Sequence, residues 1–175
     1  MDRLSELKDY MEEHILDRIN AHITAEQKYM YQNADEVKNR IILKIRKIQS
    51  GNKEVDKVII CYLYSSIAMK KNELCLIPFA NLPFAEQPEN EVYMAYSEIL
   101  KTPFMEEKYF ERILREKYVQ LLPYEVEEIR REYMYRYSEK IGDLLSELLS
   151  SCESGIRVFY GAYMEKVKEI GRVAL

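Results

Sequence analysis

The feature that most constrains the fold is an uncharged run near the middle of the chain, VIICYLYSSIAM at residues 58–69. It is too short to cross a bilayer as a helix, which takes about 20 apolar residues. A segment that is apolar on nearly every side must therefore be buried in a globular core. We expect a central helix over residues 52–72, capped by Asn52, although the Val, Ile and Tyr content also fits a buried strand.

A second constraint follows directly, in ELCLIPFANLPFAEQPEN at residues 73–90. Its prolines recur every five residues and forbid a continuous helix. We predict an apolar loop, in which ELCLIPF could form a short strand but has no evident second strand to pair with. Phe79, Leu82 and Phe84 would either fold back over the core or form an exposed patch that binds a partner.

Helical periodicity dominates the rest of the chain. Only five glycines and five prolines occur in 175 residues, which favours long helices over turn-rich β structure. Apolar residues recur at helical spacing from Leu4 to Ile19, from Val37 to Ile48 and from Val126 to Leu148. We predict helices over residues 3–22, 35–51, 52–72, 89–100, 104–121, 124–151 and 155–170.

This pattern predicts an all-α fold, an irregular bundle of roughly seven helices with a proline-rich apolar loop at 73–90. A length of 175 residues suits one domain, 1–175. The loop could instead divide the chain into subdomains 1–72 and 91–175.

Tyrosine is abundant, with 15 copies and no tryptophan. In REYMYRYSEK three tyrosines alternate, as in a strand that stacks bases, but the flanking apolar residues keep helical spacing. We therefore place Tyr133 and Tyr137 on the core face of a long helix and Tyr135 nearly opposite. Because tyrosine and arginine are enriched in binding hot spots, Tyr135 with Arg131 and Arg136 is our predicted exposed partner-binding group.

Charge is segregated along the chain. Residues 38–72 carry nine bases and two acids, whereas residues 1–37 carry nine acids and four bases. On the predicted helix 35–51, Arg40, Lys44 and Lys47 share one face. These cations would be paired within the protein, contact an acidic protein partner, or hold phosphates. The isoelectric point near 5.4 makes nucleic acid the less favoured partner.

Signals for catalysis and metal binding are weak. His14 and His22 are eight residues apart, too far to share a zinc ion from one helix. Cys61, Cys75 and Cys152 form no Cys-x-x-Cys pair, so we expect reduced thiols. No Gly-x-Ser-x-Gly or phosphate-loop motif occurs. We predict no metal and no cofactor, and the activity is uncertain but leans towards a non-enzymatic one.

The N-terminal MDRLSELKD has no apolar signal region, so we expect a cytoplasmic protein without membrane contact. The expected function is a non-enzymatic protein–protein interaction or regulatory domain, such as an adaptor, inhibitor or assembly subunit, with a protein partner or self-association. One alternative is a nucleic-acid-associated regulator that uses the basic helix 38–47. A second is a small enzyme or ligand-binding protein with a tyrosine-lined pocket.

Overall fold

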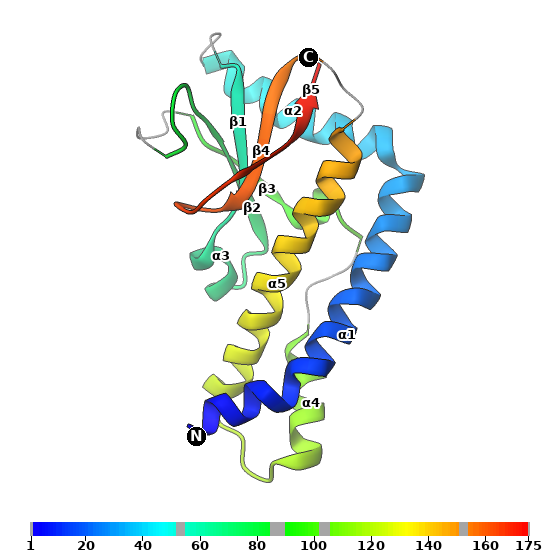
Figure 1. The fold of residues 1–175 in the computed structure, drawn as a ribbon, viewed down its shortest axis with the longest axis vertical. Helices are drawn as coiled ribbons and strands as arrows, with labels where there is room; N and C mark the ends of the chain where they lie inside the picture. The colour runs from blue at the N-terminus through cyan, green and yellow to red at the C-terminus, as the bar shows by residue number, and fades with distance from the viewer. Residues whose placement is uncertain (1, 52–54, 85–89, 102–105, 151–153, 175) are drawn as a thin grey trace.

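The computed structural model describes residues 2–51, 55–84, 90–101, 106–150 and 154–174. A sheet occupies one end of an elongated molecule, and two long helices run from it towards the other end (Figure 1). The helices are α1 (Arg3–Gln32), α2 (Ala34–Gly51), α3 (Tyr64–Ala68), α4 (Glu107–Lys117) and α5 (Pro123–Leu149), with a 3₁₀ turn η1 (Tyr96–Glu98). The strands are β1 (Lys57–Tyr62), β2 (Glu73–Pro78), β3 (Val92–Ala95), β4 (Ile156–Ala162) and β5 (Lys168–Val173).

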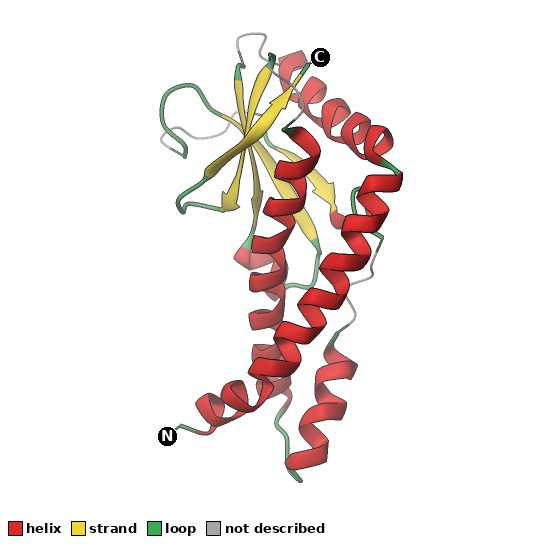
Figure 2. Cartoon of the chain, turned by 45° about the vertical axis from the view of Figure 1, so that its right-hand side comes forward, coloured by secondary structure: helices red, strands yellow, loops and turns green. Residues whose placement is uncertain are grey.

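The predicted all-α helical bundle is wrong. Within the described residues, five α-helices are combined with a mixed five-stranded sheet in the order β3-β2-β1-β4-β5. Strand β1 is central, antiparallel to β2 and parallel to β4. Figure 2 shows the twisted sheet beside the long helices. The prediction failed because a fully buried strand is apolar on both faces, so its sequence lacks the alternation that separates strands from buried helices.

The error is largest in the uncharged run. Residues 57–62 form β1 and only residues 64–68 form a short helix, so the helix over 52–72 is wrong and the strand alternative is correct for 58–62. Asn52, the expected cap, lies outside the described residues. The segment ELCLIP is the strand β2, and its partners are β1 on one side and β3 on the other.

The helices predicted over 89–100 and 155–170 are also wrong. Residues 92–95 form the edge strand β3, followed by η1. Residues 156–162 form β4, in which buried and partly exposed side chains alternate strictly. Gly155 precedes β4 with a φ of +115°, where a Cβ would lie 2.1 Å from the Val173 carbonyl oxygen. The positive φ and the close carbonyl oxygen require glycine at this position.

Local periodicity located four other helices, two of them close to their predicted bounds. The prediction of 35–51 is confirmed by α2, and 124–151 by α5, which begins at Pro123 as its first residue. Helix α4 ends at Lys117, before the predicted end at 121, and residues 104 and 105 of the predicted helix lie outside the described residues. Helix α1 continues ten residues beyond the predicted end at His22. Within α5, Tyr133 and Tyr137 are fully buried, as expected.

The two faces of the sheet are covered differently. Val58, Ile60 and Tyr62 of β1 point to the main core, which the sheet shares with α1, α2 and α5. Ile59 and Cys61 point to the other face, where a small second cluster is covered by aromatic side chains rather than by a helix. Cys61 lies directly opposite Cys75 in the β1–β2 register, and both are buried free thiols; Cys152 lies outside the described residues.

No helix in the described part of the chain combines the length and apolar character needed to span a membrane.

Candidate functional site

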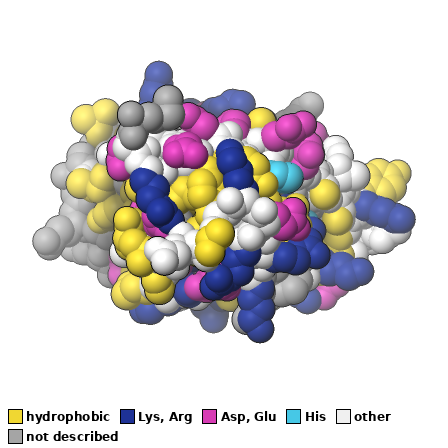
Figure 3. Space-filling model, turned by 90° about the horizontal axis from the view of Figure 1, so that it is seen from below, with side chains coloured by type: hydrophobic (Ala, Val, Ile, Leu, Met, Phe, Trp, Pro, Cys, Tyr) yellow, Lys and Arg dark blue, Asp and Glu magenta, His cyan; other side chains and the backbone are white. Residues whose placement is uncertain are grey.

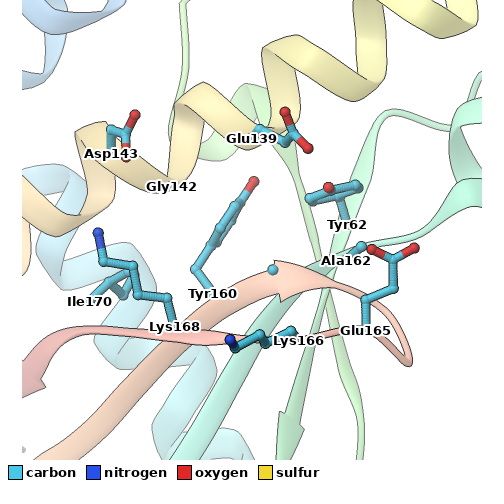
Figure 4. Close-up of a pocket in the computed structure, with 11 residues that line it drawn as sticks. Tyr62, Glu139, Gly142, Asp143, Tyr160, Ala162, Glu165, Lys166, Lys168 and Ile170 are labelled. Carbon is cyan, nitrogen blue, oxygen red and sulfur yellow. The ribbon is translucent and has the colours of Figure 1, made fainter.

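A pocket of about 210 Å³ opens where α5 crosses the end of the sheet, and we call it the Tyr62 pocket (Figure 4). Strands β1 and β4 provide Tyr62 and Tyr160 as its inner walls. Helix α5 provides Glu139 and Asp143 on one side. The β4–β5 turn and the start of β5 complete the lining with Glu165, Lys166 and Lys168.

The inner wall depends on a close approach of strand and helix. A Cβ on Gly142 would lie 2.5 Å from Cδ1 of Tyr160, so only glycine lets the tyrosine ring lie against the α5 backbone. The Tyr160 hydroxyl donates a hydrogen bond to the Ser138 carbonyl oxygen at 2.5 Å. The ring of Tyr160 is thus fixed from both ends, and the pocket is largely preformed on this side.

Tyr62 is at the acidic end of the pocket. Its side chain is almost fully buried, at 4% exposure, and its ring contacts Tyr64 and Tyr160 with centroids 6.0 and 6.1 Å away. Burial raises the pKa of Tyr62 to about 12, and the negative charges of Glu139 and Glu165 add to the rise. The hydroxyl is therefore neutral at pH 7 and acts as a hydrogen-bonding group under a negative potential.

Glu139 and Glu165 differ in how they are held. Glu165 accepts a hydrogen bond from the Tyr64 hydroxyl at 2.7 Å. Glu139 is exposed, and among the described residues it forms no hydrogen bond or ion pair. Figure 4 shows the two carboxylates on either side of the Tyr62 ring. An uncompensated carboxylate beside a second one attracts a cation.

The opposite end of the pocket has mixed charge. In Figure 4 the Lys168 amine extends towards the side of Asp143, away from Tyr62. Asp143 itself lies 3.7 Å from the amine of Lys140. The pocket therefore has an acidic end at Tyr62 and a second end where lysines can meet an acceptor group.

The predicted basic face is largely engaged inside the protein. Arg40 donates to the Glu98 carbonyl oxygen at 2.7 Å and pairs with Glu36 at 2.5 Å. Lys44 pairs with Glu98 at 2.9 Å. Only Lys47 of the three is exposed without such a contact. Intramolecular pairing, one of the three outcomes that the sequence left open, thus accounts for two of the three cations.

The predicted apolar loop residues separate into two groups. Phe79 and Phe84 are partly buried against Phe159 and Tyr163, with ring centroids 5.1 and 5.3 Å apart. They help to cover the second face of the sheet. Leu82 is 69% exposed. Residues 85–89 of this loop, including Pro88, lie outside the described residues, as does Pro103.

Tyr135 is partly buried rather than exposed. Its ring packs against Tyr64 with centroids 4.9 Å apart. Arg131 pairs with Glu127 and Glu128, and Arg136 pairs with Glu12 and Glu132. Tyr135 therefore continues the row of tyrosines that leads from Tyr62 and Tyr64 to the surface, whereas the two arginines are bound within the protein.

A second polar cluster lies deep between α1 and α5. His22 Nδ1 and the Tyr133 hydroxyl are 2.6 Å apart, and Arg18 Nε donates to the buried Glu106 carboxylate at 2.7 Å. The His22 Nε2 atom is 3.6 Å from Glu106 Oε1. These residues line neither the Tyr62 pocket nor a second pocket bordered by α1, α2 and α5. They connect α1 with α5 and with the start of α4 in the interior of the protein.

Potential metal ligands and the exposed apolar residue Val119 give no further candidate site among the described residues. Among the described residues, no group of three or more histidine, cysteine, aspartate or glutamate side chains could hold a metal ion. At the end far from the sheet, Val119 is 95% exposed in the α4–α5 connection. Figure 3 shows hydrophobic side chains at this end interspersed with both basic and acidic ones.

No sequence motif indicated the residues of the Tyr62 pocket. Its residues come from β1, α5, β4 and β5, and the predicted helices 52–72 and 155–170 cover β1, β4 and the start of β5, which are strands. One signal was present: in IRVFYGA the alternation of Ile156, Val158, Tyr160 and Ala162 has a strand period and indicates a half-buried strand.

The chain matches no known family, no curated protein and no solved structure.

Proposed function

We propose that the protein is a non-enzymatic interaction domain that binds a cationic side chain of a protein partner in the Tyr62 pocket. The observation that carries the proposal is the position of Glu139 and Glu165 beside the hydroxyl of Tyr62. Glu139 is available to an incoming group, because it forms no hydrogen bond or ion pair with the described residues.

A lysine or arginine side chain matches this chemistry. Its ammonium or guanidinium group would be shared between the two carboxylates and the neutral hydroxyl, all of which accept hydrogen bonds. Its aliphatic part would pass over the apolar wall formed by Ala162 and the Tyr160 ring. Lys168, at the other end, would meet a carbonyl or carboxylate of the same partner.

The state of Tyr62 supports binding rather than proton transfer. With a pKa raised to about 12, its hydroxyl stays protonated at neutral pH and does not serve as a general base there. The pocket volume of about 210 Å³ suits one side chain rather than a large cofactor. A free organic amine offers the same chemistry and is the second source of such a ligand.

The test is a titration followed by amide chemical shifts. The probes are Nα-acetyl-lysine amide and Nα-acetyl-arginine amide, with the uncharged Nα-acetyl-norleucine amide as the matched control. We expect shifts at Gly161 and Ala162 with the two cations, weakening with added salt because the contact is partly exposed. A simple alkylamine that binds as tightly as the capped amino acids would favour a free amine over a protein side chain.

Variants assign the binding to the pocket. Glu139→Gln should weaken cation binding several-fold and Glu139→Lys should abolish it. Glu116→Gln, an exposed carboxylate on α4, is the control and should leave binding unchanged. The proposal fails if norleucine amide produces the same shifts or if Glu139→Lys binds the cations as well as the parent protein.

Nucleic-acid binding remains a separate alternative. The engagement of Arg40 and Lys44 with Glu36, Glu98 and backbone oxygens leaves fewer cations for phosphates. A mobility-shift series in rising salt addresses it directly. Binding that disappears when Arg40, Lys44 and Lys47 are all replaced by alanine would support this alternative.

A further inference from the structure

A second pocket, of about 310 Å³, lies at the corner where α1 turns into α2, beside the last turns of α5. Its floor is apolar and consists of the buried residues Met30, Leu144 and Leu148. Tyr31 forms one wall. It shares no residue with the Tyr62 pocket, so any function it has is independent of the function proposed above.

Tyr31 is the unusual member of this site. Its side chain is 90% exposed, although it is large and aromatic. A solvated tyrosine next to an apolar hollow gives one surface both a projecting group and a cavity. Tyrosines in such positions are over-represented among the residues that dominate binding energy.

We propose that this surface is a self-association site, in which Tyr31 of each copy inserts into the pocket beside Tyr31 of the other. A two-fold axis brings the same patch of both copies together, so a group that projects from one copy can fit a cavity on the other, and the reciprocal contact forms as well. An adjacent projection and cavity on one patch satisfy that requirement, whereas a projection or a cavity alone does not.

The charges around the pocket agree with a second copy as the occupant. The rim carries Lys38 from α2 and Glu147 from α5, so it has both signs and does not repel an identical surface. Glu147 also accepts a hydrogen bond from Gln27 at 3.2 Å, and this contact between two lining residues connects α1 with α5. The cavity is therefore bounded by three helices.

The expected dimer is weak. Two inserted tyrosines and the pocket rims would bury a small surface, below about 1,200 Å² in total, which is typical of weak interfaces. We therefore expect the dimer to dissociate on dilution. Other strongly exposed apolar residues, such as Val119 and Leu82, line neither of the two pockets and lack this pairing of projection and cavity.

The experiment is sedimentation velocity with light scattering over a concentration series of the full chain. We expect a concentration-dependent monomer–dimer equilibrium. Tyr31→Ser should shift it to monomer, and Ala34→Phe, which reduces the hollow, should do the same. Val119→Ser, which removes an exposed apolar side chain far from the pocket, is the control and should leave it unchanged.

Far-ultraviolet circular dichroism and the melting temperature verify folding of each variant, and Tyr31→Ser should preserve both because the residue is exposed. The proposal is overturned if the parent chain stays monomeric throughout. It is equally overturned if Tyr31→Ser associates as strongly as the parent, or if Val119→Ser dissociates the dimer to the same extent. If the chain stays monomeric and binds a different protein, that protein is the occupant of the pocket, and the self-association proposal is wrong.

Discussion

At the scale of single residues, His22 shows how burial changes the chemistry of a group that appears unremarkable in the sequence. It lies between α1 and α5, next to Tyr133, and faces Glu106, Arg18 and Glu26. Burial lowers the pKa of His22, and the positive charge of Arg18 acts in the same direction, whereas Glu106 and Glu26 oppose it. The neutral imidazole is therefore the form that the folded protein favours.

This predicts a pH dependence of stability with a defined sign. Because the pKa of His22 is lower in the folded state, the unfolded chain binds more protons as the pH falls below about 6.5, so the free energy of unfolding should decrease there. Urea unfolding between about pH 7 and pH 5.5 measures the slope. His22→Gln should flatten it in that window. Equal slopes in both proteins would show that His22 does not contribute.

At the scale of elements, the contact between α5 and β4 decides whether the Tyr62 pocket exists. Gly142 is in the middle of a helix, where alanine would be favoured by about 1 kcal/mol on propensity alone. The Tyr160 ring occupies the space that a Cβ would need, and its hydroxyl is bound to the Ser138 carbonyl oxygen. Glycine is thus required by packing between elements and not by its own backbone.

We predict that Gly142→Ala is destabilising despite the better helix propensity. The clash should outweigh the propensity gain and give a net loss on the order of 1–2 kcal/mol, measured by chemical denaturation. Ser146→Ala, one turn further along α5, is the control and should have little effect. A stabilised Gly142→Ala protein would mean that Tyr160 moves freely, and the pocket would then not be preformed.

At the scale of the whole molecule, α5 joins the sheet to the helical end. Its last turns pack on β5 and its first turns on α4, while α1 runs beside it (Figure 1). The Arg18–Glu106 pair and the contact between His22 and Tyr133 connect these helices near the middle. The sheet also combines strands from the segments before and after residues 73–90, since β1 pairs with β4.

We therefore predict one cooperative unfolding transition rather than separate melting of segments 1–72 and 91–175. Far-ultraviolet circular dichroism, which follows the helices, and tyrosine fluorescence, which follows the core, should give coincident denaturation curves. Two transitions, or curves with different midpoints, would support the alternative of two subdomains.

Helices with a local signal are predictable from the amino-acid sequence alone. Helices α2 and α5 follow from apolar residues at helical spacing, and the inward placement of Tyr133 and Tyr137 follows from the same period. A contact between residues i and i+4 of a helix joins side chains that are close in the sequence, so the local sequence is enough to predict it. The pairing of Arg40 and Lys44 within the protein was one of three outcomes that the sequence analysis left open.

The sheet and the two pockets depend on contacts between segments that are distant in the sequence. Strand β1 is apolar on both faces because it is buried on both, and its pairing with β4 joins residues about a hundred positions apart, as Val58 and Val158 show. Such pairing is not encoded in either segment alone. Tyr62 and Glu139 become neighbours only when α5 crosses the sheet, and Tyr31 gains a cavity only when α1, α2 and α5 meet. Contacts between distant segments are set by packing, so the sites exist only in the folded chain.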